Sequence, residues 1–191
     1  MISAREIVSG LYGAFRLAIL DRNGVQYFDN SLQGFWHSFF AAVLILPLYI
    51  ILIALRYGEP GLTQDTFRYV SIEIIAYVMQ IVAFPLLMIK LANVFDADKN
   101  YYVFIIAYNW ASVLQSCFYL PIAMLIIAQV IPEPYAGTIS FFAISAILVY
   151  VWFITRVALD VSAGIAIAVV GADFFLSIMI RTFSEGMLRG G

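Results

Sequence analysis

The stretch SIEIIAYVMQIVAFPLLMIK, residues 71–90, indicates the class of fold to which this chain belongs. It is almost wholly apolar over a length close to the roughly 20 residues that a helix needs to cross the hydrocarbon core of a bilayer. Its exceptions are Glu73, Gln80, Pro85 and Lys90. The stretch predicts a membrane-spanning helix, and its polar residues raise the question of whether they bind something or hold helices together.

The composition agrees with a membrane protein and argues against several other classes. Of the 191 residues, 64% are hydrophobic and 12% are charged, whereas soluble domains are about 45–50% apolar and about 25% charged. The net charge of −2 disfavours nucleic acid as a partner. A single cysteine, Cys117, excludes an internal disulfide, and a single histidine, His37, excludes a multi-histidine metal site. Hydrolase, metalloprotease and nucleotide-binding motifs are absent from the sequence, so we expect no enzyme activity, no cofactor and no metal.

Five apolar segments predict an all-α integral membrane protein, a bundle of five transmembrane helices preceded by an N-terminal amphipathic interfacial helix. The spans are expected at about 34–57, 67–92, 101–131, 138–157 and 161–182. Residues 1–33 would form the interfacial helix and a linker, and residues 183–191 a short tail. An alternative at the last boundary is one continuous helix over 138–182 that projects from the membrane.

The N-terminal segment predicts a helix that lies along the membrane interface. Ser3 and Glu6 have the S-x-x-E spacing of a capping box. Apolar residues then recur at helical spacing, with arginines on the other face directed at lipid headgroups. The residues of this lipid-interface helix are Arg5, Val8, Leu11, Phe15, Arg16 and Ile19. The alternative is that the helix packs on the protein's own loops.

Polar residues inside the spans give the strongest functional signal, because a charge at mid-bilayer is costly and usually faces protein or water. With alternating spans, Glu73 and Asp173 are expected at similar depth, close to the level of Gln115. Gln80 shares the helix face of Glu73. We therefore expect these four residues to form an intramembrane polar cluster, which is either a hydrogen-bonded clasp between helices or a transport site.

The last span is rich in small residues. Gly164 and Ala168 are four residues apart and Gly171 follows, a spacing typical of seams along which membrane helices pack closely. Such a seam could join helices within one chain or between chains.

The distribution of Lys and Arg near the ends of the spans predicts the orientation. Six of them collect on the side of the N-terminus and four on the other side. Because cytoplasmic loops carry the excess of positive charge, the N-terminus is expected in the cytoplasm, and five spans then place the C-terminus outside.

The order of these features resembles a known family. The similarity covers about residues 68–182, chiefly ANVFDADKNYYVFIIAYNWASVLQSCFYLP (92–121) and VYVWFITRVALDVSAG (149–164). Their layout and hydropathy resemble the Yip (Ypt-interacting protein) family of five-span membrane proteins, as a bacterial-type member. The resemblance implies a role in membrane organisation, trafficking or partner recruitment, and it assigns no functional residues.

Taken together, these features favour a non-enzymatic protein that organises or recruits other membrane components. We expect it in the bacterial inner membrane, in contact with the lipid bilayer and with other membrane proteins or copies of itself. The alternative is a small transporter or channel subunit that uses the polar cluster of Glu73, Gln80, Gln115 and Asp173.

Overall fold

The computed structural model describes residues 2–57, 59, 62 and 65–190. In this part of the chain, five helical segments are long and apolar enough to cross a membrane. They are α2 (Leu32–Ser38) continued by α3 (Phe40–Arg56), α4 (Thr66–Val94), α5 (Tyr101–Ile127), α6 (Glu133–Ala158) and α7 (Ala163–Arg189). For the described residues, the prediction of an all-helical chain with five helices of spanning length is confirmed.

Local sequence explains where several of these helices begin. The side chains of Ser31, Asp65 and Ser162 accept hydrogen bonds from backbone N–H groups in the first turns of α2, α4 and α7. These are ordinary N-caps, which satisfy donors that a helix start leaves unpaired. Between α6 and α7 the chain turns through Asp160, whose φ of 55° lies in the left-handed region. Residues 138–182 therefore form two helices and not one.

Two boundaries differ from the sequence-based expectation by five residues or more. Helix α6 begins at Glu133, ahead of the expected start at 138. Helix α7 continues past 182 to Arg189, so most of the expected tail is helical. The polar residues after 182 continue the same helix without a break. Hydropathy alone does not identify them as helical, because it detects only the apolar segment.

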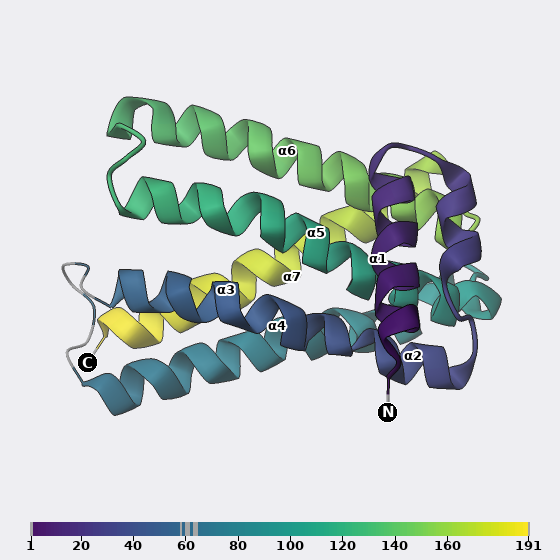
Figure 1. Ribbon diagram of the computed structural model, residues 1–191, viewed down its shortest axis with the longest axis horizontal. Coiled ribbons are helices and arrows are strands. Elements are labelled where there is room, and N and C mark those ends of the chain that lie inside the picture. The colour runs from purple at the N-terminus through teal and green to yellow at the C-terminus, as the bar shows by residue number, and fades with distance from the viewer. Residues whose placement is uncertain (1, 58, 60–61, 63–64, 191) are drawn as a thin grey trace.

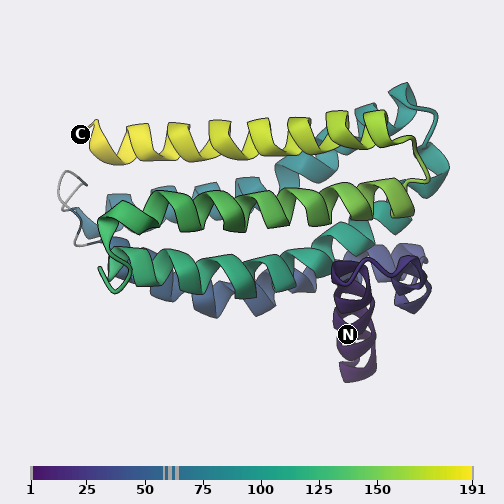
Figure 2. The ribbon, with the colours of Figure 1, turned by 90° about the horizontal axis from the view of Figure 1, so that it is seen from above.

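The helices are arranged around α5. It packs against α3 and α6 along the bundle, and against α1 (Ala4–Ala18) and α2 near its N-terminal end, while α4 packs chiefly against α7 (Figure 1). The two chain termini lie at opposite ends of the bundle (Figure 2).

Helix α1 crosses the N-terminal end of the bundle at a steep angle to the spanning helices (Figures 1 and 2). Its capping box is formed as predicted, with the Ser3 side chain on the N–H of Glu6 and the Glu6 side chain on the N–H of Ser3. Its buried residues include Gly10, which packs on Trp110 of α5, and Gly13, which packs on Gly24 and Phe28 of the segment that follows. A Cβ at Gly10 would lie 2.5 Å from Cε2 of Trp110, so glycine permits this close approach.

The residues predicted for the lipid-interface helix occupy several environments. Val8, Phe15 and Ile19 are exposed, whereas Leu11 is half-buried against the main core. Arg5 is exposed. Arg16 is instead engaged within the protein. Its guanidinium contacts Asp21 and lies over the rings of Tyr12 and Tyr27. The helix thus presents one apolar side outward and packs its small-residue side against the bundle.

Candidate functional site

A cavity of about 710 Å³ lies between the spanning helices, with walls from α3, α4, α5, α6 and α7. Its walls include many polar side chains, while large apolar side chains such as Ile75, Phe141 and Phe175 are exposed on the outside of the bundle. Arg181 and Arg189 line one end and are exposed, and Ser38 and Asn109 line the other end and are buried. We call these ends the mouth and the floor.

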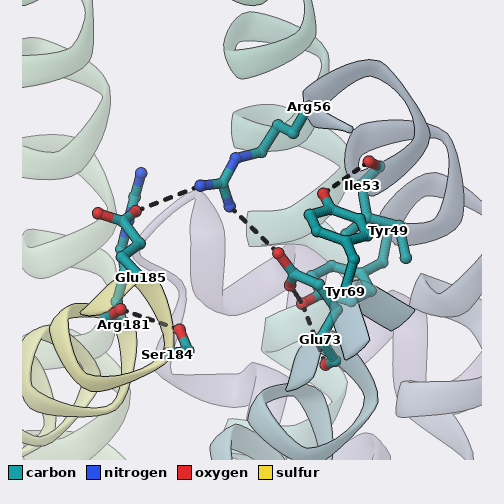
Figure 3. Close-up of polar contacts among 8 residues, drawn as sticks. All are labelled: Tyr49, Ile53, Arg56, Tyr69, Glu73, Arg181, Ser184 and Glu185. Carbon is teal, nitrogen blue, oxygen red and sulfur yellow. Dashed lines mark hydrogen bonds and ion pairs between the residues drawn. The ribbon is translucent and has the colours of Figure 1, made fainter. Parts of the chain in front are cut away.

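At the mouth of the cavity, Arg56 forms ion pairs with two glutamates on other helices. Its Nη1 lies 3.6 Å from Oε1 of Glu73 on α4, and its Nη2 lies 3.4 Å from Oε1 of Glu185 on α7 (Figure 3). Arg181 donates from Nε to the same Glu185 oxygen at 3.0 Å. These ion pairs link α3, α4 and α7 at the end of the cavity. Charges that would be costly as isolated groups in this position are thereby compensated.

Tyrosines line the middle of the cavity and join α3 to α4. The hydroxyl of Tyr49 donates to Oε2 of Glu73 at 2.6 Å, and that of Tyr77 donates to the carbonyl of Ala42 at 2.6 Å. Their rings stack with centroids 4.6 Å apart. Nearer the mouth, Tyr69 is not part of the cavity wall but also joins the two helices, because it donates to the carbonyl of Ile53 at 2.8 Å (Figure 3). Long side chains thus bridge two helices and leave space beside them.

The floor closes the cavity where α2 gives way to α3. Asn109 on α5 donates from Nδ2 to the hydroxyl of Ser38 at 2.9 Å, and Ser38 donates to the carbonyl of Phe35 at 2.7 Å. Helix α1 contacts the residues next to Asn109 and Ser38 in the chain. Gly10 packs on Trp110, and Glu6 contacts His37 at 2.8 Å. The floor is therefore a hydrogen-bonded layer backed by α1.

The structure brings together only part of the expected polar cluster. Glu73, Gln80 and Gln115 all line the cavity, but no hydrogen bond or ion pair joins any two of them in the described chain. Asp173 is half-buried behind the wall, where its Oδ1 accepts from the hydroxyl of Tyr108 at 2.9 Å. Tyr108 is thus the link between Asp173 and the cavity.

Glu73 and Asp173 do not lie at the same depth. Glu73 shares Arg56 with Glu185, whereas Asp173 precedes Glu185 by about 18 Å along α7, at about 1.5 Å of rise per residue. The expected match in depth took 182 as the end of the span, and the extension of α7 to Arg189 shifts Asp173 towards the floor.

The small-residue seam faces outward. Gly164, Ala168 and Gly171 are exposed on α7, and a Cβ at Gly164 or Gly171 would meet no described atom within 4 Å. Within the described part of this chain, the seam therefore does not pack helix against helix.

Several residues of the site escaped the sequence analysis. In the sequence Arg56 is only a basic residue at the end of a span, and Glu185 falls in the expected tail. A usable signal existed in the spacing of Ala42, Tyr49 and Arg56, which are seven residues apart and share one helix face. The i,i+4 pair of Arg181 and Glu185 was a second signal that α7 continues.

Comparisons of the chain with models of protein families, with curated proteins and with solved structures find no match. Among the described residues, no group of three or more His, Cys, Asp or Glu side chains is placed to hold a metal ion. The cavity is therefore the feature of the molecule that bears on function.

Proposed function

We propose that this protein is a small transporter, which admits a polar solute from the mouth of the cavity into the interior of the bundle. The observation that carries the proposal is a cavity of about 710 Å³ with many polar side chains in its wall, inside helices whose outer surfaces are apolar. Pockets for small molecules commonly have volumes of about 300–1,000 Å³. Polar groups at membrane depth usually mark substrate pathways, because hydrocarbon offers them no partners.

A hydrogen-bonded clasp explains the cavity less well. In a clasp the polar side chains satisfy one another, and buried donors left without partners destabilise the fold. Here the Nε2 of Gln115 is buried without a hydrogen-bond partner among the described residues. A solute or solvent in the cavity would supply the missing partner.

Transport can be tested by blocking the cavity beside a matched control. Ser116 lines the cavity, whereas the adjacent Cys117 is exposed and is not among the lining residues. Purified protein in proteoliposomes should take up at least one member of a panel of neutral, anionic and cationic small solutes faster than protein-free vesicles. Ser116→Phe should abolish this uptake and Cys117→Phe should leave it unchanged. Uptake by no member of the panel, or equal effects of the two variants, would refute the proposal.

The organising role expected from the layout is the second candidate. The observation that favours it is the outward seam of Gly164, Ala168 and Gly171, since identical seams of this kind let two copies of a membrane helix approach closely. The expected partner is thus a second copy of the chain. Gly171→Leu should convert dimers into monomers in lipid nanodiscs, and an unchanged mass would exclude this candidate.

A further inference from the structure

Three tyrosines of the cavity wall donate their hydroxyl protons to other groups of the protein. Tyr49 donates to Glu73, Tyr77 to the carbonyl of Ala42, and Tyr108 to Asp173. A hydroxyl has one proton to donate and two lone pairs that accept. These three tyrosines therefore offer hydrogen-bond acceptors to the cavity.

Serines extend the same pattern. The hydroxyl of Ser112, which also lines the cavity, donates to the carbonyl of Asn109 at 2.7 Å. At the floor Ser38 donates to Phe35 and accepts from Asn109. A solute that lies against these five hydroxyl groups must therefore donate hydrogen bonds to them.

Gln115, in contrast, offers a hydrogen-bond donor to the cavity. Its Nε2 is buried and has no partner in the described part of the chain, while the residue lines the cavity. A buried N–H without an acceptor destabilises the folded protein. The solute that relieves this destabilisation must carry an acceptor as well as donors.

The charges of the cavity are balanced and lie near its mouth. Among the described lining residues there are three arginines and three glutamates, namely Arg56, Arg181, Arg189, Glu59, Glu73 and Glu185. Beyond them the wall presents hydroxyl and amide groups, and Asp173 lies behind Tyr108. An ion that moved to this depth would lose its hydration without meeting a free charge of opposite sign in the wall, which is unfavourable.

We infer that the solute is a small uncharged molecule with several hydroxyl groups, of the polyol or monosaccharide type. A hydroxyl both donates and accepts, so it meets the demands of the tyrosines and of Gln115, whereas an ammonium group cannot accept and a carboxylate cannot donate. The inference rests on the proposed transport function and names the solute class for the same cavity.

The test uses radiolabelled sorbitol and glucose as neutral probes, with choline and glutamate as charged ones, in proteoliposomes of the full chain. We expect entry of a neutral probe and exclusion of both charged ones. Tyr77→Phe and Gln115→Leu should each reduce entry about tenfold, as expected for the loss of one hydrogen bond. Tyr101→Phe is the matched control, because Tyr101 also donates to a backbone carbonyl, that of Pro85 at 3.0 Å, but does not line the cavity.

The outcomes separate the inference from the function on which it rests. Entry of choline or glutamate, sensitive to Ser116→Phe, without entry of sorbitol or glucose would overturn the solute class and keep the transporter. Equal effects of Tyr77→Phe and Tyr101→Phe would also overturn it, since the hydroxyl facing the cavity would then matter only for folding. If no probe entered faster than into empty vesicles, both the inference and the transport proposal would fall.

Discussion

Arg56 is the residue on which the charges of the cavity mouth depend. It lies between Glu73, which is 4% exposed, and Glu185, which Arg181 also contacts. Removing Arg56 therefore leaves one buried carboxylate without its ion-pair partner, while Glu185 keeps a second arginine.

Arg56→Met should lower the free energy of unfolding by about 2–3 kcal/mol, near the lower end of values for breaking buried ion pairs, because the Arg56 contacts are longer than 3 Å. Reversible unfolding in mixed micelles measures this change. The double variant Arg56→Met with Glu73→Gln should recover more than half of the loss, since it also removes the stranded charge.

Glu185→Gln is the matched comparison. It leaves Arg56 with Glu73 and should cost less than about 1 kcal/mol, as for exposed pairs. Equal losses for Arg56→Met and Glu185→Gln would show that Glu73 does not depend on Arg56.

The sequence identified some of these residues and missed others for physical reasons. Glu73, Gln80 and Gln115 could be placed on cavity-facing positions because helical spacing determines which side chains share a face. Their partners could not be found, because Tyr49 and Arg56 belong to another helix and the relative rotation of two helices is set by packing. The depth of Asp173 depended on a helix end that apolar content alone did not reveal.

At the scale of elements, α1 shows how small residues position a helix. It packs on α5 through Gly10, and it is fastened further by the hydroxyl of Tyr150, which donates to the carbonyl of Ala14 at 2.7 Å. Glycine weakens an isolated helix, but at Gly10 it allows the close approach of α1 to α5.

Gly10→Ala should detach or displace α1, because the new methyl group would overlap the indole of Trp110. The expected loss of stability is about 1–3 kcal/mol, typical of overpacking. Hydrogen exchange of the α1 amides should accelerate. Gly171→Ala is the control, since a Cβ there meets no described atom within 4 Å and alanine is the better helix former. Slow exchange in α1 of the Gly10→Ala protein would contradict the close contact.

The start of α1 should also respond to acid. Hydrogen bonds from the backbone N–H of Ser3, from the side chain of His37 and from the hydroxyl of Ser3 lower the pKa of Glu6 from 4.5 to about 2. A carboxyl whose pKa is lower in the folded state stabilises that state above its unfolded pKa, and this contribution is lost as protons bind. The contribution of Glu6 should therefore be complete above about pH 4.5 and fade as the pH falls towards 2.

Hydrogen exchange of the α1 amides, compared with Glu6→Gln at each pH, measures this effect. The unmodified protein should lose its advantage over the variant between pH 4.5 and pH 2. A constant difference over that interval would show that Glu6 does not hold α1.

At the scale of the whole molecule, the described chain has five helices of spanning length, an odd number, and its termini lie at opposite ends of the bundle. We predict that residue 2 is cytoplasmic and residue 190 external, from the excess of Lys and Arg on the N-terminal side. In a Cys117→Ala background, Ile2→Cys and Gly190→Cys should react with an impermeant thiol reagent from opposite sides of oriented vesicles. Labelling of both from one side would contradict this topology.

The number and order of the spanning helices could be read from the sequence because each span must be apolar over a nearly fixed length. The arrangement of the helices around α5 could not be predicted from the sequence. Each of these helices is apolar on most of its surface, so its hydropathy pattern does not show which neighbouring helix it packs against. The cavity depends on that arrangement, so the polar residues were visible in advance but the space between them was not.

The closed floor has a consequence for how a membrane voltage would act on this protein. Solvent in the cavity would carry the electrical potential of the mouth side almost to Ser38 and Asn109, so that most of the voltage drop falls across the thin layer between the floor and α1. Moving one elementary charge through the whole drop corresponds to about 2.3 kcal/mol per 100 mV. The ion pairs of Arg56 would lie outside this field, whereas Ser38 and Asn109 would lie at its edge.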